Sequence, residues 1–144
     1  MFEKRFFIYQ NYHCAIRANG LGFLCGYVFI PKTHQSYNLT FVNEGELSVH
    51  GGITYEDDHL PGGYEFKLPL GKWIGFDCAH NGDGQDPDYL TIKPTMRCNI
   101  LGSLGGIFKD PSYVEQEIIN MINQLGPILH IESDEHDFKL ELPL

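Results

Sequence analysis

The fold of this chain is decided by one stretch, residues 110–127, which reads DPSYVEQEIINMINQLGP. Asp110 is a favourable helix N-cap, and Pro111 suits the first helical position because its fixed φ matches a helix. The pair Gly126-Pro127 is a typical signal for the end of a helix. Between these signals, apolar residues recur at helical spacing and form one stripe: Val114, Ile118, Met121, Ile122 and Leu125. The pattern predicts a helix over residues 111–125.

Short extended segments precede this helix. Apolar and aromatic runs bounded by turn residues predict strands at 6–9, 12–16, 25–30, 39–42, 47–55 and 72–76, and two more after the helix at 128–131 and 138–142. The helical stripe needs an apolar surface to cover, and a sheet face is the simplest one. We therefore expect a single α+β domain over residues 1–144, with a mainly antiparallel sheet packed against the helix at 111–125.

Composition and charge narrow the function classes. With 42% hydrophobic and 20% charged residues, the chain has the composition of a globular protein. Its formal net charge of −9 argues against binding to nucleic-acid backbones, which normally requires a basic face. No run approaches the roughly 20 apolar residues of a membrane helix, and charges at Glu3, Lys4 and Arg5 interrupt any secretory signal. We expect a soluble, cytoplasmic protein without a membrane partner, and self-association to a homo-oligomer stays open.

The chain has four cysteines, Cys14, Cys25, Cys78 and Cys98, and no Cys-x-x-Cys pair. Thiolate zinc sites normally use such pairs, and disulfides are rare in proteins that are not exported. We therefore expect buried free thiols. A nucleophilic Cys78 beside His80 is an alternative, and it would require a lowered thiol pKa and a base within hydrogen-bond reach.

Polar residues gather where two of the predicted strands are interrupted. The stretch 76–83, FDCAHNGD, places Asp77, His80 and Asp83 at the end of one strand, and His50 interrupts another. Because both strands turn polar at similar points, we expect these four side chains around one cavity. His34, in a polar loop, is a fifth candidate.

One interpretation of this cluster is ligand recognition. His50 and His80 would donate to phosphate or hydroxyl oxygens, and Asp77 or Asp83 would accept from ribose or base amines. Gly51-Gly52 would let a ligand approach the backbone N–H groups. Aromatic rings that could stack on a ligand are Tyr27, Tyr55, Trp73 and Phe76. No Walker-type loop or dinucleotide fingerprint is present, which argues against the usual ATP and NAD sites.

Two other interpretations stay open. His50, Asp77, His80 and Asp83 could hold a divalent metal such as zinc, iron or manganese, which would activate water for hydrolysis. Their spacing matches no strong metal motif such as His-Glu-x-x-His. Alternatively, the residues are structural. Asp77 would cap the turn that follows it by accepting backbone N–H bonds, residues 81–84, NGDG, would form an ordinary turn, and His80 would satisfy a buried carbonyl.

Several blocks resemble a family of small bacteriophage and prophage proteins: CGYV at 25–28, VHGGITY at 49–55, WIGFDCAHNGD at 73–83 and YVEQE at 113–117. The similarity runs from about residue 25 to about residue 125. Its most specific markers are His-Gly-Gly-x-Thr-Tyr and Gly-Phe-Asp-Cys-Ala-His-x-Gly-Asp. The chain departs from the family pattern at 118–122, where the family helix carries more basic and alanine residues. No activity is established for the family, so the resemblance implies no mechanism. It implies only where the protein would act, which is the cytoplasm of an infected bacterium.

Small phage proteins often act against host defence, and some bind or destroy nucleotide signals. We therefore expect a protein that binds a nucleotide-like molecule and sequesters a host defence signal. The expected ligand-binding residues are His34, His50, Gly51, Gly52, Asp77, His80 and Asp83. The alternatives are a metal-dependent hydrolase that uses the same cluster and a protein–protein interaction module without a small ligand. Whether the protein is an enzyme is left undecided.

Overall fold

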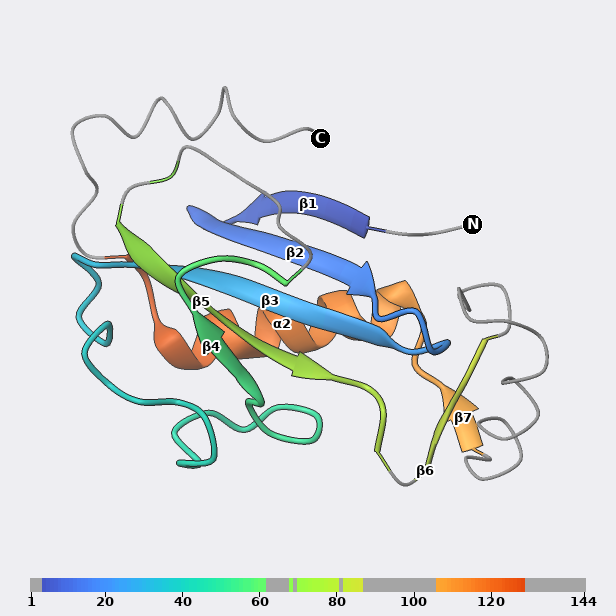
Figure 1. The fold of residues 1–144 in the computed structure, drawn as a ribbon. Helices are drawn as coiled ribbons and strands as arrows, with labels where there is room; N and C mark the ends of the chain where they lie inside the picture. Colours follow the sequence, from blue (N-terminus) through green and yellow to red (C-terminus); the bar gives the residue numbers. More distant parts are fainter. Residues whose placement is uncertain (1–3, 62–67, 69, 81, 87–105, 129–144) are drawn as a thin grey trace.

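A five-stranded antiparallel sheet in the order β1-β2-β3-β5-β4 forms the centre of the computed structural model, which describes residues 4–61, 68, 70–80, 82–86 and 106–128 (Figure 1). Its strands are β1 (Lys4–Tyr9), β2 (Tyr12–Ala18), β3 (Leu24–Pro31), β4 (Tyr55–Asp57) and β5 (Gly71–Asp77). The first three strands follow one another as neighbours. The strand β5 then adds to β3, so β4 lies at the edge of the sheet.

The helix α2 (Pro111–Leu125) lies across one face of this sheet (Figure 1). Asp110 caps its start by accepting a hydrogen bond of 2.9 Å from the Tyr113 N–H. Gly126, at φ 83°, ends it and donates its N–H to the Ile122 carbonyl over 2.9 Å. The predicted α+β fold, with a mainly antiparallel sheet against a helix at 111–125, is confirmed. Among the described residues, no helix has the length and apolar character that crossing a membrane would require.

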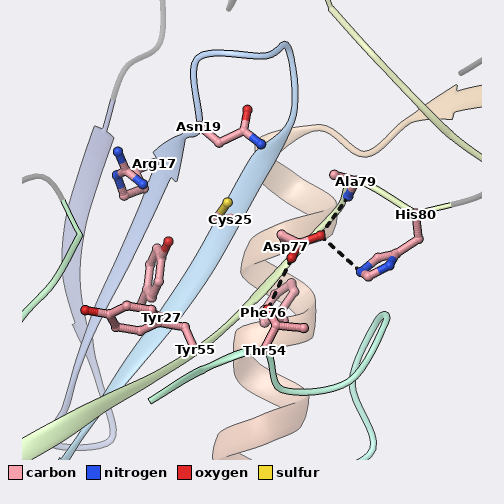
Figure 2. A pocket seen from close by; sticks show the side chains of 10 residues that line it. All are labelled: Arg17, Asn19, Cys25, Tyr27, Thr54, Tyr55, Phe76, Asp77, Ala79 and His80. Atoms are coloured by element: carbon pink, nitrogen blue, oxygen red, sulfur yellow. Dashed lines mark hydrogen bonds and ion pairs between the residues drawn. The ribbon is translucent and has the colours of Figure 1, made fainter. Parts of the chain in front are cut away.

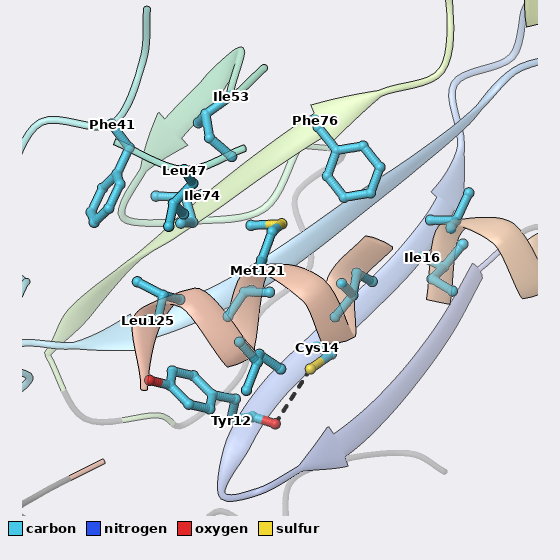
Figure 3. Close-up of a cluster of buried hydrophobic side chains, with 14 of the residues drawn as sticks. Tyr12, Cys14, Ile16, Phe41, Leu47, Ile53, Ile74, Phe76, Met121 and Leu125 are labelled. Carbon is cyan, nitrogen blue, oxygen red and sulfur yellow. Dashed lines mark hydrogen bonds between the residues drawn. The ribbon is translucent and has the colours of Figure 1, made fainter. Parts of the chain in front are cut away.

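The core lies between α2 and the sheet (Figure 3). All five residues of the predicted apolar stripe are buried, and they pack against Tyr12, Cys14, Ile16, Val28, Ile74 and Phe76 of the sheet, among others. Burying each large apolar side chain contributes about 1.5–3 kcal/mol to folding. Gly26 permits the close approach of helix and sheet, because a Cβ there would lie 2.7 Å from the Phe76 ring and 3.0 Å from Val114 Cγ1.

The other face of the sheet, called here the second face, carries the residues that alternate with these. A smaller cluster of buried side chains covers part of it: Phe6, Ala15, Cys25, Tyr27, Phe29, Leu60 and Trp73. Near the C-terminal end of β2, this alternation also places Arg17 on the second face, two residues after Ala15. The second face therefore changes from apolar to polar along β2.

The predicted strand over residues 47–55 is wrong, because β4 begins only at Tyr55. Gly51 and Gly52 adopt positive φ values of 70° and 81° and turn the chain. The backbone N–H groups of Ser48 and His50 donate to the side chains of Gln124 and Glu117 on α2, over 2.7 and 2.8 Å. This segment is therefore a loop held by the helix. It meets the neighbouring strand β5 at its end, where the Thr54 N–H donates to the Gly75 carbonyl over 2.9 Å.

The predicted strand over residues 39–42 is also wrong. The N–H groups of Phe41 and Val42 donate to the Glu56 carboxylate over 2.9 and 3.1 Å. Lys72 neutralises the same carboxylate, with its Nζ 2.6 Å from Glu56 Oε2. A side chain from β4 thus takes the place of a pairing strand.

A short parallel pair, β6 (Gly82–Gly84) and β7 (Gly106–Phe108), extends beyond β5 toward the start of α2 (Figure 1). No strand is predicted from the sequence at 82–84 or at 106–108, so this pair was not expected. The strand predicted at 138–142 lies outside the described residues, as does 129–131 of the strand predicted at 128–131.

Two buried histidines, His13 on β2 and His34 in the loop after β3, predict an acid-sensitive fold. Burial lowers the pKa of His13 on β2 from 6.5 to about 4, and burial also lowers the pKa of His34. Below pH 6.5, these two histidines therefore bind protons more readily in the unfolded chain than in the folded chain, and protonation favours unfolding. We expect the free energy of unfolding to be steady above pH 7 and to fall by roughly 2 kcal/mol between pH 7 and about pH 5, measured by urea unfolding.

The control for this prediction is His13→Gln, which keeps a polar side chain but does not titrate. Its stability should fall less over the same pH range. A wild-type stability that is constant or rises from pH 7 to about pH 5 would contradict the assignment of His13 as a buried neutral histidine.

Candidate functional site

A buried carboxylate, Asp83, joins three segments that are distant in the sequence. Its side chain is 2% exposed, and its Oδ2 accepts hydrogen bonds from His50 Nε2 over 2.8 Å and from the His80 N–H over 3.0 Å. Its Oδ1 lies 3.1 Å from Lys109 Nζ. Burial opposes the charge on Asp83, but these bonds outweigh it and hold the pKa below its ordinary value. Asp83 is therefore an ionised structural hub.

His50 is fully engaged inside the protein. An ionised Asp83 only accepts hydrogen bonds, so His50 Nε2 carries the proton that it donates. His50 Nδ1 lies 2.8 Å from the Tyr113 hydroxyl, and its backbone N–H donates to Glu117. These contacts fasten the 47–54 loop to α2, and they leave neither ring nitrogen free for a ligand.

His80 packs between His50 and the backbone of Gly51. The two imidazole rings lie 5.9 Å apart between centroids. A Cβ at residue 51 would come within 2.1 Å of His80 Nε2, and the φ of Gly51 is itself in the left-handed region. The missing side chain of Gly51 thus makes room for His80, whereas sequence analysis assigns that space to a ligand. A Cβ added at Gly52 would meet no described atom within 4 Å.

Asp77 ends β5 and is partly exposed. Its Oδ1 accepts from the Ala79 N–H and its Oδ2 from the Thr54 hydroxyl, each over 3.1 Å. His80 Nε2 lies 3.1 Å from Asp77 Oδ1, a distance suited to an ion pair, although the angle gives no hydrogen bond. The predicted turn bond of Asp77 is present, and the carboxylate also faces a cavity.

This cavity has a volume of about 480 Å³ and opens on the second face (Figure 2). Its lining consists of Arg17, Asn19, Cys25, Tyr27, Thr54, Tyr55, Phe76, Asp77, Ala79 and His80. Ligand sites usually have volumes of about 300–1,000 Å³, apolar walls and a few polar groups that converge. The volume of the cavity falls in this range, and its lining combines apolar groups with a cation, an imidazole and a carboxylate.

The strand register explains how the charged groups meet. Arg17 of β2 pairs with Cys25 of β3, and Cys25 pairs with Asp77 of β5, so the three form one row across the sheet. Neighbouring strands lie about 4.8 Å apart, which places the backbones of Arg17 and Asp77 roughly 10 Å apart. The small side chain of Cys25 lies between them. The Arg17 guanidinium and the Asp77 carboxylate therefore lie on either side of Cys25, which forms the floor of the cavity (Figure 2).

A second row, Tyr27-Gly75-Tyr55, continues this floor. A Cβ at Gly75 would lie 2.3 Å from Tyr27 Cδ1, so the glycine makes room for that ring. The rings of Tyr27 and Tyr55 meet edge to face with centroids 5.6 Å apart. Among the rings predicted for stacking, Tyr27, Trp73 and Phe76 are buried in the core, so Tyr55, which is partly exposed, is the ring that a ligand can reach.

The cavity floor is neutral between its two charged ends. Burial raises the pKa of the Cys25 thiol to about 11, and hydrogen bonding from Tyr27 only partly offsets this. Burial also raises the pKa of the Tyr27 hydroxyl, despite the neighbouring Arg17. Both groups are protonated at neutral pH, so the charges offered to a ligand come from Arg17 and Asp77, beside the imidazole of His80.

The three cysteine thiols that the structure describes are buried. Cys14, Cys25 and Cys78 are buried and free, as expected, and Cys98 lies outside the described residues. Burial raises the pKa of Cys78 to about 12, so almost no thiolate forms at neutral pH. Because the Cys78 thiol is buried and keeps its proton, the structure argues against the alternative of a nucleophilic Cys78 activated by His80.

His34 lies apart from the cavity. Its Nδ1 accepts from the Ser36 N–H over 2.9 Å, so in the neutral ring Nε2 carries the proton. That proton points to the Tyr12 hydroxyl at 2.7 Å, and Tyr12 in turn donates to the Gly126 carbonyl over 2.5 Å. His34 therefore fixes the end of α2, and the structure does not join it to the other four predicted residues.

A metal at the predicted cluster would have to displace existing contacts. Both oxygens of the Asp83 carboxylate already have partners, the ammonium of Lys109 at Oδ1 and the imidazole of His50 at Oδ2. Within the described ranges, the ligand atoms of three acidic or metal-binding side chains come within 4.8 Å of one another only at Asp57, Asp58 and His59, all exposed. The residues that the sequence analysis proposed as metal ligands form no such group.

The cavity lining includes three residues that were not predicted from the sequence: Arg17, Asn19 and Thr54. Arg17 and Asn19 lie outside the blocks that the sequence singles out, whereas Thr54 lies inside the VHGGITY block at 49–55 but carries no charge and no imidazole. A signal did exist for Arg17, because it is the one charged residue in the apolar run YHCAIRA of β2. Its position beside Asp77 depends on the register of β2, β3 and β5, which the sequence does not show.

Comparisons of the chain with models of protein families, with curated proteins and with solved structures found no match.

Replacing the central carboxylate tests its structural role. Asp83→Asn keeps the shape of the side chain but removes the charge that Lys109 and His50 face. We expect the free energy of unfolding to fall by about 3 kcal/mol, because the change leaves a cation without its buried partner. The matched control is Asp57→Asn at an exposed carboxylate, which should change stability by less than about 0.5 kcal/mol. If Asp83→Asn and Asp57→Asn lower the free energy of unfolding in urea by equally small amounts, the structural role of Asp83 is contradicted.

Proposed function

We propose that the protein binds a small nucleotide-like molecule in the cavity of the second face. The observation that carries this proposal is the convergence of Arg17, Asp77 and His80 on one cavity (Figure 2). A guanidinium binds phosphate oxygens through paired N–H groups, and an imidazole adds a further donor. The carboxylate accepts hydrogen bonds from hydroxyl or amine groups. A nucleotide carries both kinds of group on one small molecule.

The net charge of the chain makes this local arrangement important. At −9, the protein as a whole repels anions, so an anionic ligand needs a cation within the cavity itself. Arg17 supplies that cation at one end of the floor. Tyr55 supplies a partly exposed ring on which a base or sugar can pack.

Binding without turnover agrees with the chemistry of the lining. The Cys25 thiol and the Tyr27 hydroxyl stay protonated and are poor nucleophiles. The resemblance to phage proteins supports a role in which the protein acts in the host bacterial cytoplasm and sequesters a nucleotide signal of host defence. This biological role is part of the proposal.

Thermal-shift measurements with a panel of linear and cyclic nucleotides test the binding. We expect at least one nucleotide to raise the melting temperature of the wild type. Arg17→Gln and His80→Ala should each weaken that binding about tenfold or more, because each removes a hydrogen bond to a charged group. The melting temperature of unliganded His80→Ala should change little, since the side chain is partly exposed. His59→Ala, at an exposed histidine outside the cavity, is the matched control.

The absence of any nucleotide effect on the wild type would refute the proposal, and so would full binding by His80→Ala. Recovery of the ligand after heat denaturation separates binding from hydrolysis. We expect mass spectrometry to find the nucleotide intact and elemental analysis to find no stoichiometric metal. A converted nucleotide with bound metal would favour the metal-dependent hydrolase.

A further inference from the structure

We infer that the ligand of the cavity is a guanine nucleotide, whose base donates two N–H groups to Asp77 while its phosphate lies toward Arg17. This inference rests on the proposed function and names the class of nucleotide. It follows from the hydrogen bonds that Asp77 already makes and from its position in the sheet.

The carboxylate of Asp77 has one acceptor position left on each oxygen. An ionised carboxylate offers about two lone-pair sites on each oxygen. The Ala79 N–H occupies one site on Oδ1, and the Thr54 hydroxyl occupies one on Oδ2. His80 Nε2 is near Oδ1 but makes no hydrogen bond with it. Asp77 therefore has acceptor capacity on both oxygens for a ligand with two neighbouring donors, and a donor at Oδ1 would share that oxygen with His80 Nε2, which lies 3.1 Å away.

Among the common bases, guanine presents such a pair. Its N1–H and its exocyclic N2 amine lie next to each other and point in the same direction. Adenine has an amine beside a bare ring nitrogen, so its second atom would face the carboxylate with a lone pair. Asp77 is partly exposed in the free protein, and a bound base would cover its carboxylate. A ligand that leaves one carboxylate oxygen unpaired then pays for desolvation without a compensating hydrogen bond.

The existing bonds also hold the carboxylate in place. Thr54 comes from the loop before β4, and Ala79 from the turn after β5, so Asp77 is restrained from two sides. A carboxylate fixed in this way can select a ligand by the direction of its donors. The floor beside it is formed by Cys25, whose small side chain leaves room for a flat base.

The position of Arg17 sets the orientation of the ligand. It lies at the other end of the same row, roughly 10 Å from Asp77 between backbones. A base that meets Asp77 with its donor edge therefore directs its sugar and phosphate across β3. Arg17 then meets the anionic end, with the geometry that guanidinium groups use for phosphate.

Calorimetric titration of the full chain with four nucleoside 5′-monophosphates tests this inference. Guanosine monophosphate carries both donors, inosine monophosphate lacks the N2 amine, and adenosine monophosphate lacks both in this arrangement. We expect guanosine monophosphate to bind the wild type about tenfold or more tightly than either of the other two. The fourth nucleotide, xanthosine monophosphate, has an oxygen where guanine has the N2 amine, and it should bind the wild type weakly.

Asp77→Asn gives a second, independent readout. The asparagine keeps one acceptor and replaces the other with an N–H donor, which suits the oxygen of xanthine. This variant should lose affinity for guanosine monophosphate about tenfold or more and should gain affinity for xanthosine monophosphate. Asp57→Asn, which changes an exposed carboxylate away from the cavity, should behave as the wild type.

Equal wild-type affinities for guanosine and inosine monophosphates would overturn the inference while leaving the proposed nucleotide binding intact. If none of the four nucleotides binds, both the inference and the proposed function fail for mononucleotides. The wild-type comparison decides the matter even if Asp77→Asn does not fold.

Discussion

The ionised carboxylate of Asp83, buried and bonded to His50, His80 and Lys109, is the constraint on which the site depends. A buried charge is stable only when partners surround it, so the segments that carry these partners must meet. Their meeting fixes the 47–54 loop against α2 and places the backbone of Gly51 under the His80 ring. His80 is thereby held beside Asp77. Asp83 itself does not line the cavity, yet it positions one of its walls.

The parts of the fold that depend on local signals could be predicted from the sequence. The helix at 111–125 carries its cap, its stop and its apolar stripe within 18 residues, and the strands β1, β2, β3 and β5 consist mostly of apolar and aromatic residues. The loop at 47–54 could not be predicted, because side chains of α2, far along the chain, take its N–H groups. Likewise, the Glu56 carboxylate replaces a strand partner for residues 41 and 42. Alternating polarity shows which residues suit a strand, but not whether a partner strand exists.

The candidate site shows the same division. The block at 76–83 correctly indicated a concentration of polar side chains, and the structure brings His50, Asp77, His80 and Asp83 close together. The sequence could not show that the polar atoms of His50 and Asp83 bond to each other and to neighbouring residues of the protein. Nor could it show Arg17 in the same row as Asp77, because that row exists only once the register of three strands is set. The cluster of polar residues in the sequence indicated where the site lies. Which of their atoms a ligand can reach depends on contacts between distant segments of the chain.

The central claim is that the cavity on the second face, and not the structural hub or the helix, receives a ligand. The most direct measurement is an NMR titration of the isotope-labelled protein with guanosine monophosphate, followed through its assigned backbone amide signals. The account predicts that the largest shifts occur at Arg17, Cys25, Asp77 and His80, with little change at Ile118 in the middle of α2. Shifts concentrated on α2, or on β6 and β7, or no saturable shifts at all, would contradict it.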